Sequence, residues 1–387
     1  MAWPNQFATN GRYTLSAEAP MRRIRLCSLG TIATCLIMLA SVLRAADIPA
    51  TLTDQEFWRI ITEFSEAGGS FQPQLMTNED SLQTVIPALK QKIRSGGVYL
   101  GVGTEQNFTY ISALQPRIAF VLDIRRDNML EHLMYKALFE LSSDRADFVS
   151  RLFSRKRPAA LDGQSSAAAL FDAYRAVEAD SQLYEEDLRA VLDTLLVKHK
   201  MQLSESDKTQ IASFLNAFRL TGPFVLKGTG DKNLSYAQSM TGSDLAGRNQ
   251  SYLASEESFK FVQELERRNL IVPLVGDFAG SKAIASVGRY LRDHDATVDV
   301  FYVSNVERYL WEQGEPARQF YSNVDSLPLN ASSTFVRSVT VDISRRLGIA
   351  IPPGPANWRS FASSVTDFLK ALHEGRIQSY RQIFEIQ

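Results

Sequence analysis

The chain has 387 residues, of which 45% are hydrophobic and 22% are charged, and its formal net charge is -1 at pH 7. This is an ordinary globular composition, long enough for one large domain or two smaller ones. The near-zero charge argues against nucleic acid or an anionic membrane surface as a partner, because such partners attract strongly basic proteins.

Residues 1–46 are predicted to be a targeting segment outside the fold. A basic stretch over 21–25 precedes an uncharged, mostly apolar run over 26–43, and small residues follow it. This is the order of a secretory signal peptide. At roughly 18 residues, the run is also long enough to span a bilayer as an uncleaved anchor. Translation can begin at Met1 or at Met21.

The charges around the apolar run predict where the body lies. Because the basic residues precede the run, the positive-inside rule places the body outside the cytoplasm. We therefore expect an exported protein, periplasmic or extracellular, or one anchored in the inner membrane through 26–43. A cytoplasmic location follows if the segment does not function as a signal.

Cysteine and histidine usage limits the chemistry of the body. Both cysteines, Cys27 and Cys35, lie in the targeting segment, so the body has no disulfide, thiolate nucleophile or zinc ribbon. None of the histidines forms an H-x-x-H or H-E-x-x-H pair, so no metal site of the usual kind is expected.

Residues 47–96 are predicted to be an N-terminal helical segment. One helix is expected over 51–70, ended by Gly68-Gly69, since glycine supplies the left-handed cap. A second helix is expected from Thr77 or Asn78 onward, with apolar residues at spacings of three and four.

Residues 97–126 are predicted to be the first part of a Rossmann-like domain. The apolar runs 98–102 and 118–122 are typical of central parallel strands that are covered on both faces. Gly101-Val102-Gly103 follows the first strand, where glycines allow a ligand to approach the backbone and the next helix points its N–H groups at it. Asp123 ends the second strand, where an acid can accept hydrogen bonds from a ribose. The alternative remains open that the glycines only form a tight turn and that Asp123 caps the next helix.

Residues 127–220 are predicted to be a helical insertion. An apolar stripe from Leu130 to Leu141 predicts one long helix. Further helices are expected over 145–154, 166–178, 181–200 and 205–218. This stretch is too long for a single crossover helix, so we place it between two parts of one sheet.

Residues 221–387 are predicted to be the remainder of the Rossmann-like domain and a C-terminal helix. Strands are expected over 223–227, 270–275, 297–303 and 335–342. Helices are expected over 252–269, 281–292, 306–311 and 358–373. The predicted fold class is therefore α/β, a Rossmann-like three-layer sandwich with a large helical insertion.

The glycine motif does not fit a dinucleotide site, because Gln106 occupies the third glycine position of G-x-G-x-x-G. The chain instead resembles the class I S-adenosylmethionine-dependent methyltransferases over 97–126 and 270–342. Gly276-Asp277-Phe278 resembles their third motif, and Val298–Asn305 resembles their fourth strand. Over about 60–360 the chain also resembles an uncharacterised family of bacterial proteins of this fold.

The resemblance implies a methyltransferase-type fold and S-adenosylmethionine as the cofactor. It assigns five residues to the cofactor: Gly101, Gly103, Asp123, Asp277 and Phe278. It places Asn305 toward the acceptor. Two departures weaken the assignment to a methyltransferase: Tyr99 stands where the first motif has an acid, and no Asn-Pro-Pro-Tyr follows the fourth strand. No G-x-S-x-G motif indicates a serine hydrolase.

The sequence leaves three functions open. The first is a methyltransferase-like protein that binds S-adenosylmethionine or a related small adenosyl ligand, with an unknown acceptor. The second is an exported or membrane-anchored, non-catalytic binding protein on a degenerate methyltransferase fold. This alternative arises because export conflicts with a cofactor that is made and kept in the cytosol. The third is a hydrolase or transferase acting on another nucleotide or sugar. Whether the protein is an enzyme, and its oligomeric state, stay open.

Overall fold

The centre of the fold is a six-stranded, mostly parallel sheet in the order β3-β2-β1-β4-β5-β6. A computed structural model describes residues 47–72, 74–224, 234–354 and 356–386. All pairings among β1 to β5 are parallel, whereas β6 pairs antiparallel with β5. The strands are β1 (Val98–Gly101), β2 (Ile118–Asp123), β3 (Ile271–Val275), β4 (Val298–Ser304), β5 (Leu329–Thr340) and β6 (Trp358–Ser364).

The inner strands form where the sequence carries short apolar runs. Every residue of β1, β2 and β3 is buried, as expected for parallel strands covered on both faces. The register pairs Val98 with Ile118 and Asp123 with Val275. The predicted α/β class is confirmed, and the sheet is consistent with a Rossmann-like fold.

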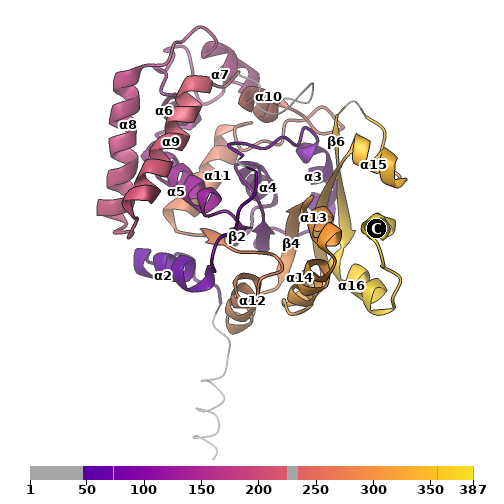
Figure 1. The fold of residues 1–387 in the computed structure, drawn as a ribbon. Helices are drawn as coiled ribbons and strands as arrows, with labels where there is room; N and C mark the ends of the chain where they lie inside the picture. The colour runs from indigo at the N-terminus through magenta and orange to yellow at the C-terminus, as the bar shows by residue number, and fades with distance from the viewer. Residues whose placement is uncertain (1–46, 73, 225–233, 355, 387) are drawn as a thin grey trace, which may run out of the picture. The chain divides into compact units, whose positions relative to one another are not determined.

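Helices cover both faces of the sheet (Figure 1). In the view of Figure 1, α4, α5 and α11 lie above α2, α12 and α14. The helices of the sheet layers are α2 (Asp54–Phe64), α3 (Ile86–Lys92), α4 (Gln106–Leu114), α5 (Arg126–Leu141), α11 (Glu256–Arg267), α12 (Ala283–Asp293), α13 (Val306–Gln313), α14 (Glu315–Asp325), α15 (Val341–Leu347) and α16 (Val365–His373). Short 3-10 helices are η1 (Leu82–Val85) and η3 (Tyr380–Glu385).

A helical block stands between β2 and β3 in the chain and lies at the upper left of Figure 1. It consists of α6 (Arg145–Phe153), α7 (Ala167–Ala173), α8 (Ser181–Asp193), the π-helix η2 (Thr194–Lys198), α9 (Glu205–Thr221) and α10 (Tyr236–Thr241). Its apolar side chains belong to the same hydrophobic core as those of the sheet. The helices predicted over 145–154 and 205–218 match α6 and α9 closely.

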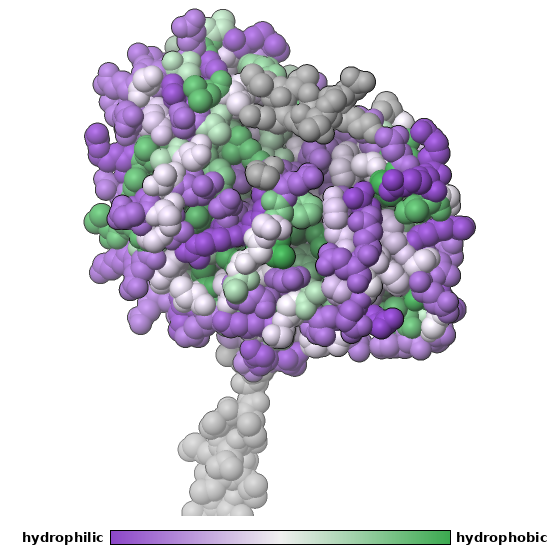
Figure 2. Space-filling view, viewed as in Figure 1, coloured by the Kyte–Doolittle hydropathy of each residue, from purple (hydrophilic) through white to green (hydrophobic). Residues whose placement is uncertain are grey.

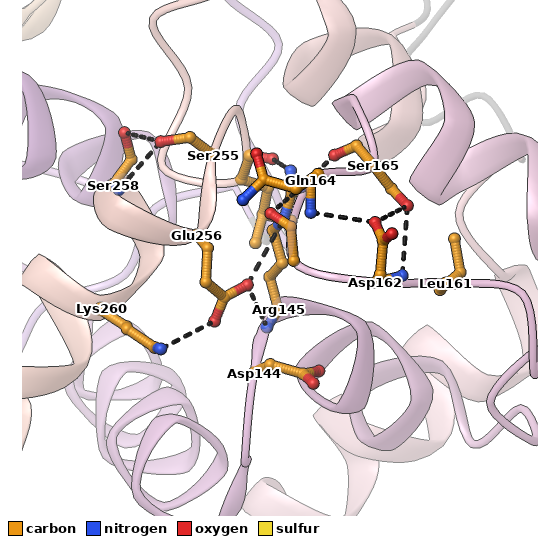
Figure 3. A network of polar contacts seen from close by, with 12 residues as sticks. Asp144, Arg145, Leu161, Asp162, Gln164, Ser165, Ser255, Glu256, Ser258 and Lys260 are labelled. Carbon is orange, nitrogen blue, oxygen red and sulfur yellow. Dashed lines mark hydrogen bonds and ion pairs between the residues drawn. The ribbon is translucent and has the colours of Figure 1, made fainter.

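Arg145 ties this block to α11 (Figure 3). Its guanidinium donates to the carbonyl oxygens of Leu253 at 3.0 Å and Ala254 at 3.1 Å, and to that of Ser165. Its Nε lies 3.5 Å from a carboxylate oxygen of Glu256, in the first turn of α11. The side chain is buried, so these contacts satisfy a charge that would otherwise be costly to bury.

The C-terminal region differs from its prediction. The single helix expected over 358–373 is a strand, β6, followed by the shorter helix α16. Ser364 separates the two, since its hydroxyl accepts a hydrogen bond from the Asp367 amide at 3.1 Å and caps α16. The segment before it pairs with β5 over seven residues, from Trp358 to Ser364, a non-local preference that helical periodicity does not reveal.

The N-terminal helices are also shorter than predicted. α2 begins after a capping box between Thr53 and Glu56 and ends before Ser65, not at Gly68-Gly69. The second predicted helix begins with η1 at Leu82. The predicted strand 223–227 is wrong at its start, where Pro223 and Phe224 lie in a turn, and its remainder falls outside the described residues.

The face of the protein in Figure 2 is mainly hydrophilic, with apolar residues in small separate groups. The large apolar side chains that are exposed lie apart in the sequence: Phe71, Val197, Leu220 and Leu245. Among the described residues, no helix combines the length and apolar character that a membrane crossing requires. The predicted targeting run 26–43 lies outside those residues.

Candidate functional site

The carboxyl ends of β1 and β4 form the switch point of the sheet. The chain leaves β1 through α4 toward β2, and it leaves β4 through α13 and α14 toward β5 on the opposite side. In open α/β sheets, ligands bind outside the carboxyl ends of the strands at such a point. All the predicted site residues follow or end strands β1 to β4 at this edge: Gly101, Gly103, Asp123, Asp277, Phe278 and Asn305.

A segment that we call the strap, residues 65–81 without residue 73, covers this edge. The strap leaves α2 in an extended conformation at Ser65, whose hydroxyl accepts a hydrogen bond from the Val275 amide at 3.0 Å. Glu66 accepts from the Asp277 amide at 3.1 Å, and the Gly69 amide donates to the Ile124 carbonyl at 2.8 Å. The strap is therefore bonded to the ends of β3 and β2.

The second half of the strap is bonded to the other side of the switch point. Glu79 is buried and accepts hydrogen bonds from the hydroxyl of Ser304, at the end of β4, and from that of Ser338 on β5 at 2.6 Å. Burial raises the pKa of Glu79, against the opposing effect of these hydroxyls. Asp80 accepts from the Trp358 amide at 2.9 Å.

The glycine loop after β1 is tightly packed by the chain's own side chains. A Cβ on Gly101 would lie 2.0 Å from Oδ1 of Asn107 and 2.7 Å from the hydroxyl of Tyr99. Tyr99 donates to this Oδ1 at 2.9 Å, and the Asn107 amide group donates to the Thr104 carbonyl at 2.8 Å. Tyr99 thus orients the side chain that holds the loop, at the position where the methyltransferase motif has an acid.

Gly103 has a φ of +84°, which a residue with a side chain adopts only with strain. A Cβ here would lie 2.5 Å from Nε2 of Gln106. The side chain that replaces the third glycine of the dinucleotide motif therefore fills space directly above the loop.

Asp123 lies at the end of β2, as predicted, but its carboxylate is already engaged. Arg125 donates to both oxygens from Nε and Nη2, each at 3.1 Å, and its amide adds a third bond at 2.9 Å. Both side chains are buried. A ribose could bind Asp123 only by sharing or replacing the contacts of Arg125.

Asp277 and Phe278 follow β3 and differ in environment. Asp277 is half-buried and accepts a hydrogen bond from the Ala279 amide at 2.9 Å, which closes its own turn. Phe278 is buried, and its ring stacks on Phe320 at 5.2 Å between centroids. The ring of Phe278 is thus part of the hydrophobic core.

Asn305 follows β4 at the start of α13 and is half-buried. The residue before it, Ser304, has a φ of +52°, an unusual conformation for a residue with a side chain. Strained backbone of this kind clusters at functional sites, and here it lies at the switch point.

Sequence reasoning missed a group of buried polar side chains on α5. They stand at positions i, i+3, i+4 and i+7, so they share one face of the helix. We call this the polar face of α5: Asn128, Glu131, His132 and Tyr135. His132 Nε2 lies 2.9 Å from the Gly103 carbonyl oxygen, which joins the polar face to the glycine loop. The apolar stripe of α5 was visible in the sequence, but nothing local showed that the opposite face is also covered.

Burial shifts the pKa values of Glu131 and His132 on this face and of the nearby Glu105. It raises the pKa of Glu105 to about 7, against hydrogen bonds from the Thr104 hydroxyl and the Thr77 amide. It raises the pKa of Glu131 well above the ordinary value, and the nearby Glu105 adds to the shift. It lowers the pKa of His132 to about 4. Such perturbed groups gather at functional sites more often than elsewhere.

Two concave surfaces lie away from the carboxyl edge. One, of about 310 Å³, is lined by α2 and α12, with Arg59 and Tyr290 among its residues. The other, of about 550 Å³, lies between α14 and the C-terminal region and includes Trp311 and His373. Within the described ranges, no group of three His, Cys, Asp or Glu side chains is placed to hold a metal ion.

The comparisons with known proteins identify a family, but its description names no activity. A domain of unknown function, DUF7790, has a sequence model that matches residues 75–386. The match covers both parts of the sheet and the helical block between them. No curated protein matches the chain significantly.

Proposed function

The protein belongs to the DUF7790 family, and we propose that it is a methyltransferase-like Rossmann-fold protein that binds S-adenosylmethionine or a related adenosyl ligand. The ligand would lie at the carboxyl edge of the sheet, between the ends of β1 and β4. Gly101 and Gly103 would face it from β1, and Asp123 and Asp277 from β2 and β3.

The observation that carries this proposal is the position of the switch point. The glycine loop and the strained Ser304 end the two neighbouring strands at which the chain diverges. A ligand in this crevice would meet backbone N–H groups at the start of α4, which favour anionic or polar groups.

Binding at this position requires the strap to move. The strap and its partners occupy the space above β2 to β5, and Gln106 and Asn107 fill the space above the glycines. Part of the binding free energy would therefore be spent on releasing these contacts, so we expect modest affinity.

For methyl transfer, the chain would act mainly by positioning. An acceptor would be held in line with the methyl group, a contribution that fixed geometry alone can make large. Asn305, half-buried after β4, is the side chain that we place toward the acceptor. The cofactor supplies the electrophilic methyl group.

A second candidate is a non-catalytic binding protein on a degenerate methyltransferase fold. It is favoured by Asp123, whose two carboxylate oxygens are both bonded to Arg125. It also removes the conflict between export and a cytosolic cofactor. A reporter fused to the C-terminus would establish the compartment.

Isothermal titration of the full-length protein with S-adenosylhomocysteine tests the proposal. We expect saturable binding that Asp123→Asn weakens by about 1–3 kcal/mol, the scale for a lost buried hydrogen-bond partner. Asp127→Asn, an exposed neighbour on α5, is the matched control and should leave the affinity unchanged. Absence of binding at millimolar ligand, with folded protein, would refute the proposal. Binding without transfer from labelled S-adenosylmethionine to amines, phenols or carboxylates would favour the second candidate.

A further inference from the structure

The polar face of α5 contains buried atoms that have no hydrogen-bond partner among the described residues. They are both carboxylate oxygens of Glu131, Nδ1 of His132 and Nδ2 of Asn128. All three residues are at most 2% exposed. Buried polar groups are almost always paired, and leaving one unpaired costs about 1–3 kcal/mol. Several such atoms on one helix face indicate that a bound molecule pairs with them.

His132 presents a hydrogen-bond acceptor on this face. Its Nε2 faces the Gly103 carbonyl at 2.9 Å, and a carbonyl oxygen can only accept, so the proton lies on Nε2. Burial lowers the pKa of His132 to about 4, so the ring is neutral. Nδ1 therefore carries a free lone pair.

Acidic side chains outnumber basic ones around Glu131. Arg125 is already paired with Asp123, and Glu105 accepts hydrogen bonds from the Thr77 amide at 3.1 Å and the Thr104 hydroxyl at 2.7 Å. The charged groups that influence Glu131 are Glu105, Asp123, Arg125 and Asp127. No cation of the described residues lies within ion-pair distance of Glu131. The partner that fits this face is thus a positively charged donor.

We infer that the polar face of α5 is a binding subsite for an organic ammonium group. Glu131 is the counter-ion, His132 Nδ1 accepts an N–H, and the Asn128 amide donates to an oxygen of the same molecule. The ring of Phe108 lies 5.3 Å from those of both His132 and Tyr135, so an aromatic side chain packs directly beside these polar groups. This inference goes beyond the adenosyl proposal and does not depend on it.

Binding of a cation has a proton balance that can be measured. Burial raises the pKa of Glu131 well above its ordinary value, which favours the neutral, protonated carboxyl over the carboxylate. An ammonium group stabilises the carboxylate, so the carboxyl proton passes to solvent as the ammonium enters. Up to one proton is released for each molecule bound, and affinity rises with pH.

The ammonium group has two possible sources, the amino-acid end of an adenosyl ligand or a separate amine. Titrations use S-adenosylhomocysteine, 5′-methylthioadenosine, which lacks the amino-acid end, and ethanolamine. Proton release is followed with an indicator dye in weakly buffered solution. The proteins are full-length wild type, Glu131→Gln, and Glu266→Gln as a matched control. Glu266 is another fully buried glutamate with a raised pKa, and it lies away from this face, on α11.

If the adenosyl ligand carries the ammonium, wild type binds S-adenosylhomocysteine at least tenfold more tightly than 5′-methylthioadenosine. Glu131→Gln then removes the difference and the proton release, but it keeps the affinity for 5′-methylthioadenosine. If a separate amine is the ligand, Glu131→Gln instead weakens ethanolamine binding at least tenfold. Glu266→Gln behaves as wild type in both cases.

Several outcomes overturn the inference. One is equal binding of every probe by wild type and Glu131→Gln, and another is binding without proton release. A third is no binding of any ammonium probe, which leaves hydration as the partner of these atoms. Ethanolamine binding without adenosyl binding contradicts only the proposed function. If Glu131→Gln does not fold, Glu131→Asp replaces it and should keep the proton release with weaker binding.

Discussion

Glu266, on α11, shows how a single ionisable residue affects this fold. Its side chain is fully buried, and burial raises its pKa to about 8, against the opposing effect of Lys136. Lys136 is itself buried, with Nζ 2.8 Å from Glu140. Because the folded-state pKa exceeds that of the unfolded chain, the unfolded chain loses this proton first as the pH rises. Between about pH 4.5 and 8, Glu266 therefore makes the folded state progressively less stable.

Glu266→Gln should remove this dependence. We expect the variant to gain stability over wild type as the pH rises from 5 to 8, by about 1–3 kcal/mol at pH 8. Urea unfolding at several pH values measures it. Glu264→Gln is the control, since Glu264 is about half exposed and pairs with Arg268 on the surface. A constant difference between Glu266→Gln and wild type across this range would contradict the prediction.

At the same scale, the sequence predicted that the candidate residues lie at strand ends, but it did not predict their contacts. The positions of Gly101 and Asp123 follow from apolar runs that end in glycine or acid, which is a local pattern. The partner of Asp123, Arg125, is also nearby in sequence, but a local pattern does not show whether an arginine at a helix start pairs with an acid or with solvent. The unpaired atoms of Glu131 and His132 depend on helices far along the chain, so no local pattern reports them.

Among the elements, the strap is the one whose structure least resembles its prediction. Its sequence is mostly polar, is interrupted by Gly68-Gly69 and has no periodicity. Its conformation is set by contacts with β2 to β6, not by its own propensities. The inner strands were predictable because burial on both faces demands an apolar run. β6 was not, because its residues are only partly buried and its pairing with β5 is non-local.

Gly280→Ala should loosen the strap without unfolding the protein. A Cβ on Gly280 would lie 2.2 Å from Oε1 of Glu66, the far end of a flexible side chain, so Glu66 would move away from the Asp277 amide. We expect hydrogen exchange at Glu66 and Gly69 to speed up roughly 5- to 30-fold, which corresponds to about 1–2 kcal/mol. Gly163→Ala is the control, because a Cβ there meets its nearest atom at 4.0 Å. Unchanged exchange in Gly280→Ala would show that Glu66 does not hold the strap.

At the scale of the whole molecule, the helical block and the sheet share one hydrophobic core. Phe148 on α6 stacks on Phe139 of α5 at 4.6 Å and also contacts Phe259 of α11. The described residues, which begin at Asp47, form one compact unit. We therefore expect it to unfold in a single transition, although a large insertion in sequence often indicates a separate domain.

Phe148→Ala tests this cooperativity. The described tryptophans, Trp58, Trp311 and Trp358, all lie outside the helical block, so their fluorescence reports on the sheet and its neighbouring helices. We expect loss of about 3–5 kcal/mol in the fluorescence transition and in the circular dichroism transition alike. Val197→Ala, at an exposed site of the block, should leave both unchanged. Separation of the two transitions would show that the block unfolds independently.

The strap also fixes an order of events during synthesis. Glu79 bonds Ser338, 259 residues further along the chain, and Asp80 bonds the Trp358 amide 278 residues away. The strap is thus made before any strand that it covers, yet its second half can close only after β5 and β6 have emerged from the ribosome. Contacts of such long range form late in folding, because they require closure of a large loop. Until β6 is made, the edge of the sheet above β4 and β5 therefore stays open.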